Sequence, residues 1–288
     1  MRGFFMLRER RHRVRVVKDH NVAKARTATL NVDTLTGRSC ELAAALEDRR
    51  IDLCAAQETR WSGNKSKDIG HGFKVVYNGS PMTRNGVGIV VSQCFRDSIA
   101  EVQRFDDRLT KVVVTTAKQR LHFFSAYAPQ TGCCEQVKDD FWMLLDEKTA
   151  EVPMKDTIIV AGDLNGHVGA AKDGYRCHGG FGYGTRNDDG ERILEYAVSH
   201  DLVIMNTKFR KRPTQLVSFY TGNAQTQIEF VLVRHCDQKL VTDAKVAPYE
   251  AVATQHRPLI CTMKIMAPKR MHDERCGTAR IKWPLPVA

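Results

Sequence analysis

Residues 156–169 read DTIIVAGDLNGHVG, an apolar run that ends abruptly on polar side chains. Residues 158–161 are apolar without interruption, which predicts a strand buried on both faces. Such a strand belongs inside a sheet that is covered on two sides. Asp163 and Asn165 come directly after the run, so the strand delivers a carboxylate and a carboxamide to one edge of its sheet. The stretch therefore predicts a layered fold with a polar site at a sheet edge.

The same alternation of short runs extends over residues 27–266, with many strands and few helices. The strands are expected at 27–32, 52–57, 73–78, 86–92, 99–105, 109–116, 121–127, 157–162, 202–207, 216–221, 227–233 and 259–265. The helices are expected at 37–50, 134–152 and 188–201, the second with Val137, Phe141, Leu144 and Leu145 on one stripe. We interpret the pattern as one α/β domain in which two sheets pack face to face with helices outside.

Net charge is concentrated at the two ends of the chain. Of the overall +11, residues 1–26 carry nine Lys/Arg and two acids, and residues 267–288 carry five Lys/Arg and two acids. We expect two basic, disordered arms, 1–26 and 267–288, that flank the domain and bind phosphate backbone. A basic arm is also common as a solubility feature or a localisation signal, so charge alone indicates a nucleic-acid partner only weakly.

Composition excludes several classes of protein. No apolar run approaches the ~20 residues of a membrane span, and the short GFFML segment is followed at once by RERRHRVR, which is unlike a signal peptide. Nine cysteines without C-x-x-C spacing indicate free thiols in a reducing compartment rather than a disulfide framework or a zinc site. We therefore expect a chain that is not secreted and does not bind membranes.

Polar side chains also follow or lie within other strands of the predicted sheets. They are Asn31, Asp33, Glu58, Tyr127, Glu229, Gln255 and His256. Any one of them is most simply a turn former, a cap or a core histidine. Together with Asp163 and Asn165, however, they supply oxygen ligands for a hard cation such as Mg²⁺ or Mn²⁺, and a histidine and amides for phosphate contacts. That inventory predicts metal-assisted hydrolysis of a phosphoester.

The ordered motifs LNVD, QETRW, YAP, GDLN, a strand acid and an x-His before the last strand resemble the endonuclease/exonuclease/phosphatase superfamily over residues 27–265. The chain looks most similar to apurinic-type endonuclease domains of RTE-type non-LTR retrotransposons and to craniofacial development protein 2-like chains. QETRWSGNKSKDIGHGFKVVYNG, NGVGIVV, YAPQTGC and GDLNGHVG carry that resemblance. It implies a four-layer α/β sandwich of two packed, mostly antiparallel sheets flanked by helices.

The resemblance also implies a role for each residue. Glu58 and Asp33, with Gln255 at the matching position, would hold Mg²⁺ or Mn²⁺. Asp163 would orient or deprotonate the attacking water, and Asn31 and Asn165 would hold phosphate oxygens. Tyr127 would lie against the scissile phosphate, while His256, oriented by Glu229, would stabilise developing charge. The implied partner is DNA, nicked to leave a 3′-hydroxyl, with no small-molecule cofactor and a nuclear location.

Two positions depart from the superfamily pattern. Glu229 stands where the family usually has Asp, which moves the carboxylate one methylene further out. Gln255 replaces the Asp of the usual Asp-His pair, so a formal charge is lost. The other site residues match, which favours an active enzyme.

Three hypotheses remain open at this point. The first is a Mg²⁺-dependent DNA endonuclease, and the second is a phosphatase of the same superfamily. The third is a catalytically weakened or inactive derived protein that binds nucleic acid or chromatin, which the two departures support. Residues 267–288 show no reverse transcriptase, so we expect a stand-alone derived protein or a fragment of an element.

Overall fold

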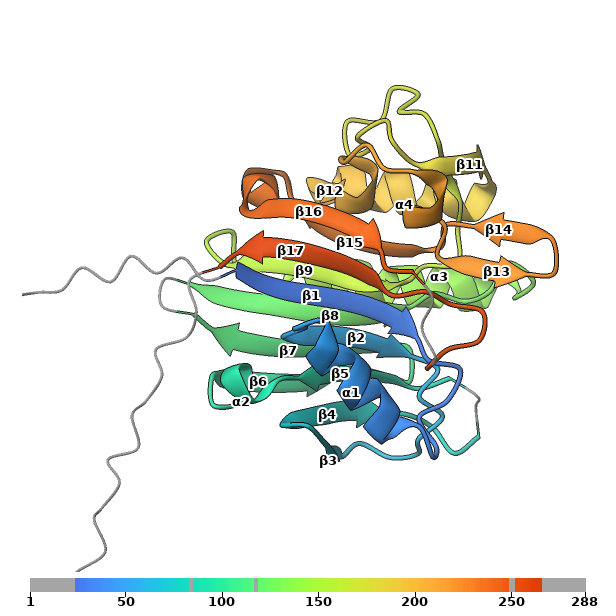
Figure 1. Ribbon diagram of the computed structural model, residues 1–288. Coiled ribbons are helices and arrows are strands. Elements are labelled where there is room, and N and C mark those ends of the chain that lie inside the picture. The colour runs from blue at the N-terminus through green and yellow to red at the C-terminus, as the bar shows by residue number, and fades with distance from the viewer. Residues whose placement is uncertain (1–23, 83–84, 117–118, 249–251, 266–288) are drawn as a thin grey trace, which may run out of the picture.

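Two sheets packed face to face form the centre of the computed structural model, which describes residues 24–82, 85–116, 119–248 and 252–265 (Figure 1). The first sheet runs in the order β16 (Val241–Val246), β17 (Leu259–Lys264), β1 (Lys24–Asn31), β2 (Leu53–Gln57), β5 (Val87–Val91), β4 (Phe73–Asn78) and β3 (Ser66–Gly70). The second runs β12 (Leu202–Ile204), β15 (Glu229–Arg234), β9 (Thr157–Asp163), β8 (Arg120–Tyr127), β7 (Leu109–Thr115) and β6 (Ile99–Arg104).

Neighbouring strands within these two sheets are antiparallel except β1–β2 and β8–β9, which are parallel. Two small hairpins extend from the sandwich: β10 (Val168–Gly169) with β11 (Tyr183–Arg186), and β13 (Phe219–Thr221) with β14 (Ala224–Thr226). Four α-helices complete the described chain: α1 (Ser39–Asp48), α2 (Gln93–Arg96), α3 (Glu135–Ala150) and α4 (Asp188–Ser199). Short 3₁₀ turns occupy Met205–Thr207, Pro213–Gln215 and His235–Leu240.

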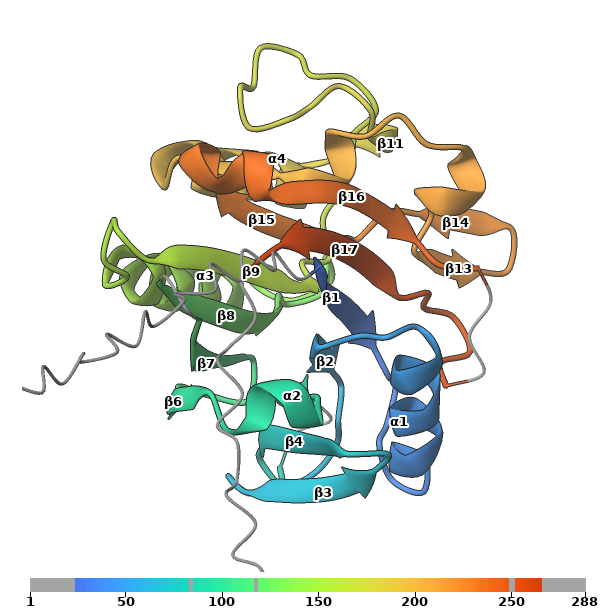
Figure 2. The ribbon, with the colours of Figure 1, turned by 60° about the vertical axis from the view of Figure 1, so that its left-hand side comes forward.

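Three apolar clusters define the layers. The first lies between the sheets and joins side chains from both, such as Ile89 and Phe123. The second packs the other face of the second sheet against α3 and α4, and the third packs the other face of the first sheet against α1. In Figure 2, α1 and α3 lie on opposite sides of the two sheets. This α/β/β/α layering confirms the predicted four-layer sandwich.

The structure corrects the sequence interpretation at three places. β1 begins at Lys24, inside the predicted arm, because Lys24, Ala25 and Arg26 pair with residues of β17. The strand expected at 216–221 begins only at Phe219, because Pro213 starts a 3₁₀ turn just before it. The Val137 side chain is exposed rather than part of the buried α3 stripe, which Phe141 and Leu145 form instead. The rest of the predicted arms lies outside the described residues.

Among the residues that the structure describes, no helix combines the length and apolarity that a membrane crossing requires.

The start of α4 is fixed by a cap that also anchors the loop after β9. The Asn187 Oδ1 accepts from the Gly190 N–H at 2.9 Å and from the His167 N–H at 2.8 Å. Asn187→Ala removes the acceptor of both donors, so we expect the free energy of unfolding to fall by about 1–2 kcal/mol. Thermal denaturation should show Tm lower by roughly 2–8 °C.

Asn187→Asp is the matched control for this prediction, because it keeps the oxygen acceptor and favours the helix N-terminus. We expect its Tm to stay near that of the parent. An alanine variant as stable as the parent would show that the cap does not anchor the loop.

Candidate active site

Three predicted site residues form one row across the second sheet. Tyr127 ends β8, Asp163 ends β9 and Glu229 begins β15, and the strand register pairs Tyr127 with Asp163 and Asp163 with Glu229. All three side chains are buried. Because paired residues on adjacent strands carry their Cβ atoms about 5 Å apart on one face, this row concentrates two carboxyl groups and a phenol at one sheet edge.

The first sheet contributes its residues from the ends of two parallel strands. Asn31 ends β1 and pairs with Gln57 at the end of β2, so Glu58 follows directly. Asp33 comes two residues after Asn31, and its backbone N–H donates to Asn31 Oδ1 at 3.1 Å. Since the carboxyl ends of parallel strands meet at the same edge, the two sheets present their polar residues side by side.

Asn31 links the site residues of the first sheet directly to those of the second. Its Nδ2 donates to Glu58 Oε1 at 2.9 Å and to Asp163 Oδ2 at 3.1 Å, across 132 residues of sequence. Asn31 is itself 1% exposed, so both amide protons are used in fixing carboxylates. One carboxamide thus sets the relative positions of the acidic residues that the two sheets supply.

Glu58 is surrounded by further donors. The Tyr127 hydroxyl donates to Glu58 Oε1 at 2.8 Å, and Arg60 donates to Glu58 Oε2 at 3.0 Å. Burial raises the pKa of the Tyr127 hydroxyl above its ordinary value, and the Glu58 charge adds to the shift. Tyr127 therefore remains a protonated donor throughout the physiological range.

Four of the eight non-glycine residues with a left-handed φ among the described residues lie at this site. Asp33, Glu58, Arg60 and Asn165 all have left-handed φ angles of 51–56°. This region is uncommon for residues other than glycine, and it is least favourable for a residue such as Glu58 that is neither Asn nor Asp. Strained positions of this kind cluster at functional sites, where the surrounding structure holds them.

The Asp163 carboxylate is buried within the cluster. Besides the bond from Asn31, its Oδ1 accepts from the Asn165 N–H at 3.2 Å. Burial raises the pKa of the Asp163 carboxyl to about 7, and the Glu229 charge adds to the shift while His256 and the two hydrogen bonds oppose it. Asp163 can thus take up a proton near neutral pH, as a general base must.

His256 is held by the strand acid. Its Nδ1 lies 2.5 Å from Glu229 Oε1, and both side chains are buried. Burial disfavours the protonated ring, but the charge and hydrogen bond of Glu229 outweigh it and raise the pKa of His256 to about 9. The longer Glu side chain therefore still reaches the ring. Its second oxygen, Oε2, has no partner among the described residues.

Two predicted residues lie further out. Asp33 Oδ2 accepts from the Thr254 hydroxyl at 3.0 Å, which ties the first sheet to the loop before β17. Gln255 is exposed, and its Nε2 reaches Thr221 Oγ1 at 3.5 Å. Asn165 Nδ2 donates to the Ala128 carbonyl at 2.8 Å, which leaves its second amide proton free to donate.

The structure adds residues that the sequence did not single out as functional. Arg60 binds Glu58, and its position directly after QET was the only signal. Arg108 lies over the Tyr127 ring at 5.1 Å and donates to the Tyr127 carbonyl. Phe219 packs its ring 4.7 Å from that of His256. These contacts join the β6–β7 turn, β13 and the β2–β3 loop to the site.

Comparison with solved structures identifies the architecture. AP endonuclease LMAP from Leishmania major superposes with a TM-score of 0.65 at 14% identity, covering 84% of this chain and 88% of that one. The endonuclease domain of TRAS1, a telomere-specific non-LTR retrotransposon, superposes with a TM-score of 0.62 at 15% identity, covering 85% and 100%. The chain has the endonuclease/exonuclease/phosphatase fold. A 3′ phosphatase from Neisseria bound to a product DNA hairpin shares it, with a TM-score of 0.62 at 17% identity over 83% and 99% of the two chains.

Sequence comparison finds two curated relatives of the chain. The chain is 25% identical to craniofacial development protein 2 of Bos taurus over 222 residues, which is 76% of this chain and 37% of that protein. It spans about two fifths of the length of the curated relatives it matches. No protein-family model matches the chain.

The donor set of this endonuclease/exonuclease/phosphatase fold suits a divalent metal in two ways. Glu58 and Asp33 offer carboxylate oxygens at the rim, where Mg²⁺ finds the ligands it prefers. Asp163, Glu229 and His256 each offer a ligand atom, and these atoms lie within 4.8 Å of one another. In this buried trio, however, His256 Nδ1 is already engaged with Glu229. Glu58 Oε1 and Oε2 likewise accept hydrogen bonds from Asn31, Tyr127 and Arg60, so the rim and the buried trio are two candidate positions for the ion.

Proposed function

We propose that the chain is a divalent-metal-dependent phosphodiester hydrolase that nicks DNA and leaves a 3′-hydroxyl. The observation that carries the proposal is the double hydrogen bond of Asn31, which holds Glu58 and Asp163 in a fixed relation beside the His256–Glu229 pair. Glu58 offers a carboxylate for a metal, Asp163 offers a carboxylate that can accept a proton, and protonated His256 offers a cation for a phosphate oxygen. These are the parts that phosphoester hydrolysis requires.

In the proposed mechanism, Glu58 and Asp33 would hold Mg²⁺ or Mn²⁺, which would supply Lewis-acid polarisation of the scissile phosphate. Asp163 accepts a proton from a water molecule whose oxygen attacks phosphorus. His256, protonated and held by Glu229, donates through Nε2 to a phosphate oxygen and stabilises its growing charge. Asn165 orients the phosphate through its free amide proton. The bond from phosphorus to the 3′-oxygen breaks, and the departing 3′-oxygen takes a proton from solvent water. The products are a 3′-hydroxyl and a 5′-phosphate.

DNA is the substrate that the charge distribution and the structural neighbours favour. The sequence outside the described residues is basic on both sides of the domain, which strengthens contact with a polyanion through counterion release. The neighbours include AP endonucleases, a retrotransposon endonuclease domain and a complex with a DNA hairpin. A DNA substrate implies a nuclear location, which is part of the proposal.

Nicking of supercoiled plasmid by the full chain tests this function. We expect conversion to the open circular form with Mg²⁺ or Mn²⁺ and none with EDTA. A small phosphomonoester should be a poor substrate, and its preferential hydrolysis would identify a phosphatase instead. DNA binding that weakens with salt, without any metal-dependent nick, would support the alternative of an inactive protein that binds nucleic acid. Gln255 and Glu229 favour that alternative because both depart from the family pattern.

The acidity of two residues predicts the pH dependence of nicking. Asp163, with a pKa raised to about 7, must be deprotonated to act, whereas His256, with a pKa raised to about 9, must be protonated. We therefore expect the rate to rise as pH passes through about 7 and to fall above about 9. Initial rates between pH 5.5 and 10 at constant ionic strength measure it. A rate that does not change between pH 6 and 8 would exclude Asp163 as the base.

Gln255 offers a gain-of-function test. Gln255→Asp restores a carboxylate beside His256, which is a stronger metal ligand than a neutral amide. Because the side chain is exposed and screened by solvent, we expect only a modest rise in nicking rate, about 2- to 10-fold. Gln255→Asn is the neutral control and should not raise the rate. An aspartate variant slower than the parent would show that the amide itself is required here.

A further inference from the structure

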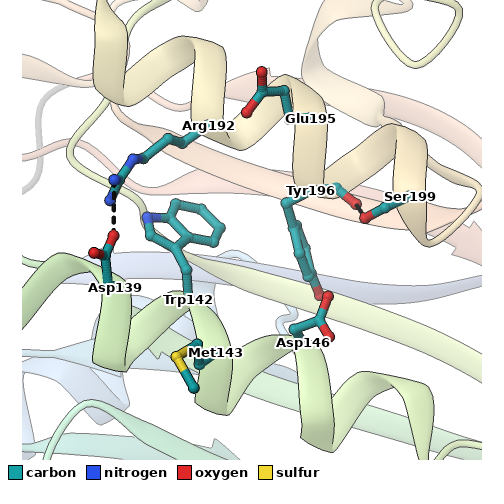
Figure 3. Close-up of a pocket in the computed structure, with 8 residues that line it drawn as sticks. All are labelled: Asp139, Trp142, Met143, Asp146, Arg192, Glu195, Tyr196 and Ser199. Carbon is teal, nitrogen blue, oxygen red and sulfur yellow. Dashed lines mark hydrogen bonds and ion pairs between the residues drawn. The ribbon is translucent and has the colours of Figure 1, made fainter.

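A groove lies on the outer side of the second sheet, between α3 and α4 (Figure 3). It encloses about 440 Å³. Trp142 and Met143 of α3 and Tyr196 of α4 supply its apolar surface, and Asp139, Asp146 and Glu195 supply carboxylates. None of these six belongs to the site described above, and the nicking mechanism uses none of them.

The apolar part of the groove is exposed at Met143 and partly exposed at Trp142, whereas Tyr196 is buried. The Met143 side chain is 70% exposed. The Trp142 ring, only partly buried, lies 5.4 Å from that of Tyr196. A thioether beside two aromatic rings forms an adaptable apolar surface of the kind that binds varied side chains. Val137, nearer the start of α3, is exposed as well.

The charge of the surrounding helices is opposite to that of the chain. α3 and α4 together carry nine Asp/Glu and three Lys/Arg, whereas the whole chain has a net charge of +11. The three basic side chains are engaged in ion pairs: Lys138 with Asp189, Lys148 with Glu147 and Glu151, and Arg192 with Asp139. The excess carboxylates therefore favour a cationic occupant and disfavour DNA.

One segment of this chain matches both features of the groove. Residues 4–15 read FFMLRERRHRVR, four apolar side chains followed by five arginines and one acid. Residues 267–288 are less basic: their apolar run, WPLPVA at 283–288, contains two prolines and has only Arg280 and Lys282 close to it. An extended chain spans ~3.3 Å per residue, so nine residues before Lys24 reach about 30 Å and eighteen reach about 60 Å. A domain of this size has a radius of gyration of about 18 Å, which puts the groove within reach.

We propose that residues 4–15 dock intramolecularly in the α3–α4 groove, with the apolar residues against Trp142 and Met143 and the arginines against the carboxylates. The docked arm is unavailable to nucleic acid, so the groove and the substrate compete for it. This role goes beyond the proposed hydrolase and does not depend on it, because docking requires only the fold and the acidic groove. Salt weakens such contacts, so the docked fraction falls as ionic strength rises.

A benzophenone photo-crosslinker introduced at Met143 of the full chain tests the proposal. Mass spectrometry should locate the main crosslink within residues 4–15 of the same chain, with its yield reduced several-fold at 1 M salt. The same probe at Met82, which is 90% exposed on the loop after β4, should not reach that segment. A crosslinked dimer would assign the groove to a second copy, and a crosslink to 266–288 would assign it to the other arm; either overturns the proposal.

Charge-neutral variants provide an independent readout. Asp146→Asn combined with Glu195→Gln removes two exposed groove carboxylates, so trypsin should cleave after Arg8 to Arg15 about 3- to 10-fold faster, in line with the loss of weak, screened ion pairs. Glu41→Gln combined with Asp48→Asn on α1 makes the same charge change elsewhere and should leave the cleavage rate unchanged. Equal cleavage in both variants, together with no crosslink from Met143, would exclude docking.

Discussion

Asp163→Asn abolishes metal-supported nicking, with an expected fall in kcat of about 10³-fold or more. The change keeps the shape of the side chain and removes its ability to carry a proton away from water. The remaining amide oxygen can still accept the hydrogen bond from Asn31 or from the Asn165 N–H, so the geometry of the rest of the site should be largely preserved. Single-turnover nicking of plasmid in Mg²⁺ measures the loss.

The same variant should be more stable than the parent at alkaline pH. The pKa of the Asp163 carboxyl is raised to about 7 because burial and the Glu229 charge disfavour its ionised form. A raised carboxyl pKa means that the parent loses stability as pH climbs from the ordinary value near 4 through about 7. The substituted asparagine has no charge to bury, so the Tm of Asp163→Asn should exceed that of the parent above pH 7 and approach it at pH 4–5.

Asp156→Asn is the matched control for the nicking measurement only, because Asp156 immediately precedes β9, at the opposite end from Asp163, while its buried contact with His122 affects stability by itself. It should nick at the parent rate. Two results would contradict the assignment: Asp163→Asn retaining more than a tenth of the parent kcat, or losing activity only because its folded fraction falls. Gain of stability with loss of activity is what a strained, charged active site predicts.

The sequence predicts that polar residues gather at one edge of the sheets, but it does not predict which of them contact one another. Apolar runs that end in Asp163, Tyr127 and Asn31 place polar groups at strand ends, and parallel pairing brings such ends together. Yet the bond from Asn31 to Asp163 crosses from one sheet to the other. That proximity depends on how two twisted sheets stack, which no local pattern encodes.

The same limit explains the residues that were missed. Arg60 and Thr254 lie beside predicted site residues in sequence. Their contacts, however, depend on the left-handed turn at Glu58 and on how the loop before β17 packs against Asp33. The α3 stripe was misjudged because Val137 satisfies the helical period while lying beyond the edge of the sheet-facing surface. Periodicity gives a face of a helix, and the neighbouring elements decide how much of it is covered.

The other large effect is expected from substituting Glu229. The substitution tests whether Glu, one methylene longer than the Asp usual in the superfamily, still positions His256. Glu229→Gln replaces the charged acceptor of the His256 Nδ1 hydrogen bond with a neutral amide. The pKa of His256 should fall from about 9 toward its ordinary value near 6.5, because the largest influence that raises it is the Glu229 charge. Loss of the oriented, protonated ring should lower kcat by about 10²- to 10⁴-fold at pH 8, as loss of the orienting carboxylate does in a Ser-His-Asp triad.

Glu229→Asp separates position from charge. It keeps the carboxylate but shortens the side chain by one methylene, which moves the carboxylate away from the His256 Nδ1 atom that it contacts at 2.5 Å in the parent. A misplacement of about 1 Å can cost roughly 10²-fold in rate. The alkaline limb of the pH profile distinguishes the two variants from simple unfolding: it should move well below pH 9 in Glu229→Gln and remain closer to 9 in Glu229→Asp, while Tm reports folding separately. If Glu229→Gln keeps both its rate and an alkaline limb at about 9, Glu229 does not position His256, and the departure from the family's Asp is only a change in packing.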